Sequence, residues 1–206
     1  MENKSAYYVH CFAHQLQLTP VAVAENHMRI FTFFDVVVQL SNIVGASCKR
    51  RDILREKQFE NVIEGICNDD ILTGREEGKD HKKRAPANNM LKLMGKYEFI
   101  FQMHLMKNIL AVTNDLSQAL QRKDQDIVNA TILIISSKQQ LQTMRDDGWD
   151  SLLKEFSLFC VKYKVVTLHM EDLFVFHGRS RRNTEGRTNL HYFRVETFYE
   201  VIDLQL

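Results

Sequence analysis

Two apolar stripes at helical spacing, separated by a short polar connection, constrain the fold of this sequence most strongly. The first stripe runs from Phe99 to Leu120 and the second from Ile127 to Met144. Apolar residues that recur every three or four positions form one face of an amphipathic α-helix. Because the connection between the stripes is short, we expect two long helices that lie side by side in antiparallel orientation.

Residues with capping preferences predict where the helices in this half begin and end. Asp124 is the expected N-cap of the second helix, because its carboxylate accepts hydrogen bonds from the free amides of the first turn. Gly148 is expected to end that helix as a left-handed cap. The segments predicted after it are a helix over Ser151–Tyr163, a strand or buried turn over Val165–His169, a loop over Phe174–Arg187 and an amphipathic segment over Asn189–Leu206.

The N-terminal half is predicted to begin with a short strand and to continue as helices. Tyr7–Phe12 is β-branched and aromatic, which favours a strand, and Pro20 is expected to break the helical pattern that follows. The apolar stretch Met28–Val44 is expected to form a buried helix that ends at Gly45. Lys49–Ile66 then shows the spacing of an amphipathic helix.

The sequence contains only two prolines and eight glycines, which favours long helices over many short strands. Residues 68–88 are polar and carry runs of charge, which is typical of a linker. The predicted organisation is therefore a first part over residues 1–67, the linker over 68–88, and a helical region over 89–206.

Composition indicates an ordinary folded protein. Apolar residues make up 45% and charged residues 26%, and the net charge of +1 provides no global field toward nucleic acid. The apolar runs around Phe31–Val38 and Ile132–Ile135 are too short to cross a bilayer, and the first residues lack the core of a signal peptide. The four scattered cysteines match no disulfide framework, so we expect a reducing compartment, nucleus or cytoplasm, and no membrane partner.

The pair Cys11 and His14 has the Cys-x-x-His spacing of two metal ligands. A zinc site needs two further ligands at tetrahedral geometry, and no other cysteine or histidine is paired at ligand spacing. The alternative is a buried thiol beside a core or capping histidine. We therefore expect neither a metal nor any other cofactor.

No catalytic constellation is recognisable. The acidic pairs at 69–70, 146–147 and 171–172 are adjacent in sequence, and neighbouring residues do not face each other on a helix. A phosphate-binding loop and a nucleophile elbow are both missing from the sequence. These observations predict no enzymatic activity and no small-molecule substrate.

Two basic clusters are the candidate nucleic-acid contacts. An arginine offers a planar fork of donors that suits phosphate, while short charged runs are also common on solvated surfaces. The residues concerned are Lys49, Arg50 and Arg51 in one cluster and Arg179, Arg181, Arg182 and Arg187 in the other. Base-stacking platforms need exposed rings beside positive charge. The aromatic groups Phe31, Phe33, Phe34, Tyr192, Phe193, Phe198 and Tyr199 are instead expected in the core.

A family resemblance rests on several stretches of the sequence. The run from Tyr7 to Leu18 contains the Cys11-x-x-His14 motif, within Tyr-Tyr-Val-His-Cys-Phe-Ala-His-Gln-Leu-Gln-Leu. This run resembles the strand-to-helix segment of the hAT superfamily of DNA transposases, in particular the TTF-type and MYM-type zinc-finger proteins. The stretches 121–130 and 144–150, and Arg179–Arg182 with Thr188–Tyr192, resemble the helical insertion domain of that family.

The resemblance implies a mostly α-helical chain, in which a residual strand–helix piece of an RNase H-like core precedes the helical insertion domain. In hAT transposases, three acidic residues of that core hold the divalent metal ions that act on DNA. None of the three maps onto this sequence, because the family's aspartate would precede Ala6 and its glutamate would follow Leu206. The family's zinc finger and its C-terminal dimerisation region do not map either. Its tryptophan between the helical blocks is missing, and Trp149 stands in a different context.

These comparisons of motifs predict a transposon-derived, non-catalytic chain that contacts DNA or a related transposase-like protein. The alternatives are a sequence-tolerant DNA-binding module, a helical protein-interaction module, or one piece of an active metal-dependent transposase.

Overall fold

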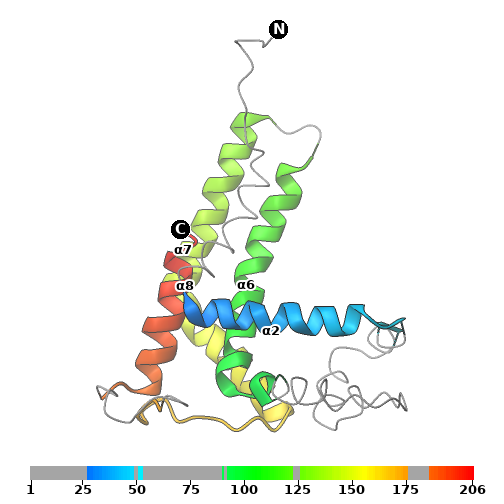
Figure 1. The fold of residues 1–206 in the computed structure, drawn as a ribbon. Helices are drawn as coiled ribbons and strands as arrows, with labels where there is room; N and C mark the ends of the chain where they lie inside the picture. The colour runs from blue at the N-terminus through cyan, green and yellow to red at the C-terminus, as the bar shows by residue number, and fades with distance from the viewer. Residues whose placement is uncertain (1–26, 49–50, 53–89, 91, 123–125, 176–185) are drawn as a thin grey trace.

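The computed structural model describes residues 27–48, 51–52, 90, 92–122, 126–175 and 186–206. Over these residues the protein is mostly helical, as predicted, and contains no strand (Figure 1). The only pairing of β type that they contain is one isolated antiparallel bridge between Leu173 and Thr188. The elements, in chain order, are α2 (Met28–Gly45), α6 (Tyr97–Leu120), α7 (Ile127–Lys162), the π-helix η2 (His191–Tyr199) and α8 (Glu200–Asp203).

Helices α6 and α7 form the predicted antiparallel hairpin, and Figure 1 shows them side by side along its whole length. The buried faces of the two helices carry aromatic rings that contact one another in the core. The ring of Phe101 lies 5.6 Å from that of Phe156 and 6.0 Å from that of Trp149, measured between centroids. The Phe101–Phe156 pair meets edge to face at 89°, an arrangement that the ring quadrupoles favour.

The N-cap of α7 is Asp126 and not the predicted Asp124, which lies outside the described residues. One carboxylate oxygen of Asp126 accepts a hydrogen bond from the backbone amide of Asn129 at 2.7 Å. Both aspartates are suitable caps by residue type. The helix begins after the second one, at Ile127, and its first buried residue is Ala130.

Gly148 does not end a helix, and the separate helix predicted from Ser151 does not exist. Helix α7 is continuous over 36 residues and passes through both positions. A Cβ atom added at Gly148 would lie 3.1 Å from Cγ of Met144 and 3.8 Å from the ring of Phe198. The glycine therefore serves a close approach of η2 to the middle of α7, and the prediction of a left-handed cap is wrong.

The C-terminal segment η2–α8 is the amphipathic element predicted over Asn189–Leu206, and it packs along α7 (Figure 1). Its buried side chains include Phe193, Phe198 and Ile202. The turns of η2 are wider than those of an α-helix, since the amide of Glu200 donates to the carbonyl of Val195 five residues earlier.

The chain between α7 and η2 is irregular. Val165–His169 forms neither the strand nor the buried turn that was predicted, and residues 166–169 are exposed. The loop predicted over Phe174–Arg187 is closed at its base, where the amide of Phe174 donates to the carbonyl of Arg187 at 2.8 Å. Residues 176–185 lie outside the described part of the chain.

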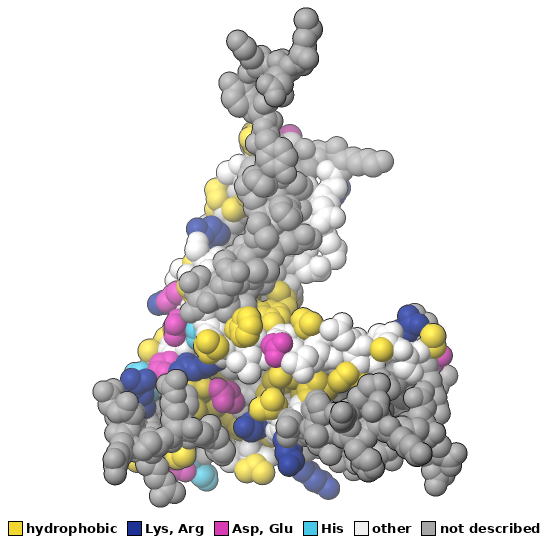
Figure 2. All heavy atoms as spheres, viewed as in Figure 1, with side chains coloured by type: hydrophobic (Ala, Val, Ile, Leu, Met, Phe, Trp, Pro, Cys, Tyr) yellow, Lys and Arg dark blue, Asp and Glu magenta, His cyan; other side chains and the backbone are white. Residues whose placement is uncertain are grey.

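Helix α2 ends at Gly45 as predicted and lies across α6 (Figure 1). Only one side of α2 is buried. The prediction of a buried helix is therefore wrong for the other sides of α2. Phe33 is 6% exposed and its ring centroid lies 5.1 Å from that of Phe99, whereas Phe31 is 53% exposed. Figure 2 shows apolar side chains gathered where α2 crosses the hairpin.

By length and composition, α2 is a helix that could cross a membrane, with 18 residues at a mean hydropathy of 1.3. A helix that belongs to a protein core meets the same criterion. The apolar helix thus spans 18 residues and is longer than the apolar run Phe31–Val38.

Several predicted elements fall outside the described residues. They are the strand over Tyr7–Phe12, the break at Pro20, the linker over residues 68–88 and most of the helix over Lys49–Ile66. Of that last helix, residues 51–52 are described and are helical.

Candidate functional site

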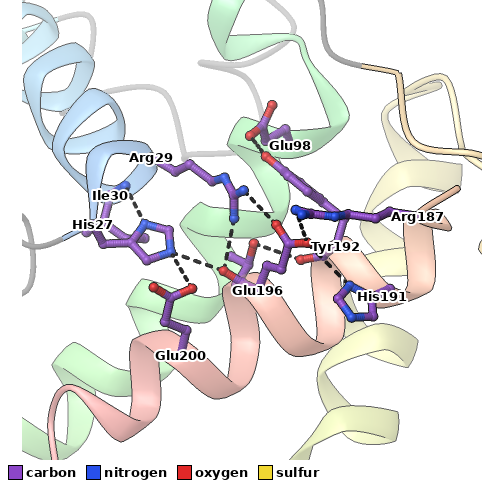
Figure 3. Close-up of polar contacts among 10 residues, drawn as sticks. His27, Arg29, Ile30, Glu98, Arg187, His191, Tyr192, Glu196 and Glu200 are labelled. Carbon is purple, nitrogen blue, oxygen red and sulfur yellow. Dashed lines mark hydrogen bonds and ion pairs between the residues drawn. The ribbon is translucent and has the colours of Figure 1, made fainter. Parts of the chain in front are cut away.

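The carboxylate of Glu196 lies at the centre of a polar cluster between α2 and η2 (Figure 3). From α2, Nη2 of Arg29 donates to Oε2 of Glu196 at 2.9 Å. From the loop before η2, Nη1 of Arg187 donates to Oε1 at 2.8 Å. The Nδ1 atom of His191 lies 3.3 Å from the same Oε1. One carboxylate therefore joins side chains from three separate segments.

The backbone carbonyl of Glu196 ties α2 to η2 a second time. It accepts from Nη1 of Arg29 at 3.0 Å and lies 3.1 Å from Nε2 of His27. The other ring nitrogen of His27, Nδ1, accepts from the amide of Ile30 and so caps the N-terminus of α2. Because Nδ1 accepts, the neutral ring carries its proton on Nε2 and donates it toward Glu196. His27 is thus a capping residue that also docks its helix.

The electrostatics of the cluster keep Glu196 ionised. Its side chain is only 16% exposed, and burial alone would raise the pKa of the carboxyl group. The hydrogen bonds and positive charges of Arg29 and Arg187 outweigh burial, and the pKa of Glu196 lies below its ordinary value. A carboxylate with a lowered pKa is a weak general base, so this position suits structural pairing better than proton transfer.

Tyr192 extends the cluster into the core. Its hydroxyl donates to the carboxylate of Glu98 on α6, and the guanidinium carbon of Arg29 lies 4.3 Å from its ring centroid. The ring of Phe174 stacks on that of Tyr192, with the centroids 3.5 Å apart and an interplanar angle of 11°. Burial, followed by the charge of Glu98, raises the pKa of Tyr192, so the phenol stays protonated.

A shallow, open depression of about 740 Å³ lies beside the cluster. It is lined by Gly186, Arg187, Thr188, His191, Glu196 and Glu200. Side chains of both signs line it, and Glu196 is paired there with Arg187 and His191. This arrangement does not concentrate one sign of charge for a ligand, and its evident role is to hold α2 and the loop base against η2.

Of the residues predicted to contact nucleic acid, the structure describes Arg51 and Arg187, which lie on different segments of the chain. Arg187 points into the polar cluster and binds Glu196. Arg51 lies near the end of α2, exposed, with its Nη2 atom 3.0 Å from the sulfur of Cys48. The remaining residues of both clusters, Lys49, Arg50, Arg179, Arg181 and Arg182, and the motif residues Cys11 and His14, lie outside the described residues.

Most of the aromatic residues that were expected in the core are buried. The buried ones include Phe33, Tyr192, Phe193 and Phe198. The prediction is wrong for Phe31, which is exposed to solvent on α2. Burial excludes Tyr192 and Phe193 as a base-stacking platform.

Of the acidic pairs, those at 146–147 and 171–172 lie within the described residues, and the pair at 69–70 lies outside them. The carboxylate of Asp146 accepts hydrogen bonds from Gln142, and Asp147 is exposed beside it. Within the described ranges, no group of three or more histidine, cysteine, aspartate or glutamate residues is placed to hold a metal ion.

A second surface, without ionisable clusters, lies on the half of α7 next to its N-terminus. Val128, Ile132 and Ile135 are 64%, 58% and 51% exposed, and we call these three residues the distal apolar row. Between Ile127 and Thr143 the only charged side chain is that of Lys138. The surface around the distal apolar row is therefore polar and almost uncharged.

The roles of Arg29 and Glu196 were not predicted, although the sequence contains a signal for each. Arg29 is the only basic residue of α2, and an isolated charge in an apolar helix requires a partner. Glu196 lies among inward-facing residues of the amphipathic C-terminal segment, between Tyr192 and Phe198. The chain matches no family model and no solved structure.

Proposed function

We propose that this chain is a non-catalytic, transposon-derived helical scaffold that binds another protein through the distal apolar row on α7. The motifs that resemble hAT transposases support the transposon-derived part of the proposal. They also imply that the N-terminal segment around Cys11 and His14 is the residual strand–helix piece of an RNase H-like core. The helical character of the described residues fits the insertion domain of that family.

One observation carries the interaction role. Three β-branched side chains of α7 are more than half exposed, in line, on a surface with almost no charge. Contiguous apolar surface of this kind typically marks a contact with another protein or a membrane. We place the function in the nucleus or cytoplasm, without a membrane, a small-molecule substrate or a cofactor.

The polar cluster around Glu196 supports the non-catalytic part of the proposal. The Glu196 carboxylate is matched by two arginines, and the hydroxyl of Tyr192 is buried against Glu98. Groups that are paired in this way stabilise the docking of α2. They are poorly suited to activate a nucleophile, since the pKa of Glu196 is lowered and that of Tyr192 is raised.

The alternative of DNA binding is weakened at one of its residues, because Arg187, although 46% exposed, is paired with Glu196. Binding to duplex DNA whose salt dependence falls by about 0.9 for each neutralised arginine at 179, 181 and 182 would favour that alternative. Strand transfer or nicking of DNA by the purified chain with Mg²⁺ or Mn²⁺ would overturn the non-catalytic proposal.

Site-specific photo-crosslinking tests the interaction role directly. A photoreactive amino acid is placed at Ile132 in the full chain, in cells that produce it, and a matched chain carries it at Gln140, which is exposed on α7 about 80° around the helix from Ile132. We expect a discrete protein adduct from position 132 and none from position 140. Equal labelling at both positions, adducts with nucleic acid alone, or no adduct at either position would contradict the proposal.

A further inference from the structure

We draw no further inference here: the strongest candidate, the exposed apolar side of α2 with Met28, Phe31 and Val38, is a surface patch for which nothing in the described part of the chain shows what covers it.

Discussion

Glu196 shows how a single residue holds distant parts of this chain together. Its side chain and carbonyl bind Arg29 and His27, which are 167 and 169 residues away in sequence. Both contacts between Arg29 and Glu196 are partly buried. An unpaired charge in such a setting costs more free energy than it does in water. The contribution of Glu196 therefore comes from charge neutralisation as much as from hydrogen bonding.

Replacement of Glu196 by glutamine keeps the shape of the side chain and removes its charge. We expect Glu196→Gln to lower the free energy of unfolding by about 2 kcal/mol, because Arg29 and Arg187 then lack their counter-ion. Urea denaturation provides the measurement. The control is Glu155→Gln, which breaks an exposed ion pair with Lys107 and should cost below about 1 kcal/mol. Equal losses of unfolding free energy for the two variants would show that the ion pairs of Glu196 stabilise the protein no more than an exposed ion pair does.

The pH dependence of stability provides a separate test of the same carboxylate. The pKa of Glu196 is lower in the folded chain than its unperturbed value of 4.5, so the folded state binds fewer protons in that range. Its stabilising contribution is therefore complete above that value and is lost as the pH falls through the lowered pKa. The difference in unfolding free energy between the native chain and Glu196→Gln should shrink between about pH 5 and pH 2. A difference that stays constant over this interval would contradict the assigned pairing.

At the scale of elements, α7 passes without a break through Gly148, where η2 packs against it. The position faces η2, where Phe198 approaches the helix backbone and Trp149 packs 5.5 Å from the Phe198 ring. The wider turns of η2 help to bring several aromatic residues onto the same buried side. Such π-helical geometry is rare and is retained where packing requires it.

Gly148→Ala distinguishes a helix interior from a helix cap. In the interior of α7, alanine is favoured over glycine by up to about 1 kcal/mol, and the flexible side chain of Met144 needs to move only a few tenths of an ångström. We expect Gly148→Ala to raise the midpoint of thermal unfolding slightly. Gly148→Leu should lower it, since the larger side chain meets the ring of Phe198. A strong loss of stability with alanine would restore the prediction of a left-handed cap.

At the scale of the molecule, the described residues form an aromatic core at the open end of the hairpin, where α6 begins, and an arm formed by the halves of α6 and α7 next to their connection. Helix α2 crosses the core and is held there by Phe33 and by the cluster around Glu196. The distal apolar row lies away from this polar cluster, on α7. The residues that hold α2 in place and the proposed interaction surface thus lie at different ends of the hairpin.

Two phenylalanines of α2 test its docking onto the hairpin. Phe33→Ala should lower the unfolding free energy by about 3 kcal/mol, because it leaves a cavity against Phe99. Phe31→Ala should change it by less than about 0.5 kcal/mol, since that ring is exposed. Denaturant titration of both variants gives the comparison. Similar effects at both positions would mean that α2 is not docked on one side.

Local sequence determined which segments become helices, because helical periodicity and capping act over three or four residues. The stripes from Phe99 to Leu120 and from Ile127 onward were sufficient to predict the hairpin, and the apolar run to Gly45 predicted α2. Tertiary structure decided the rest. It carried α7 through Gly148, left Phe31 exposed and paired Arg187 with Glu196. These outcomes depend on partners from distant segments, and no short-range pattern records which distant charge or ring a side chain will meet.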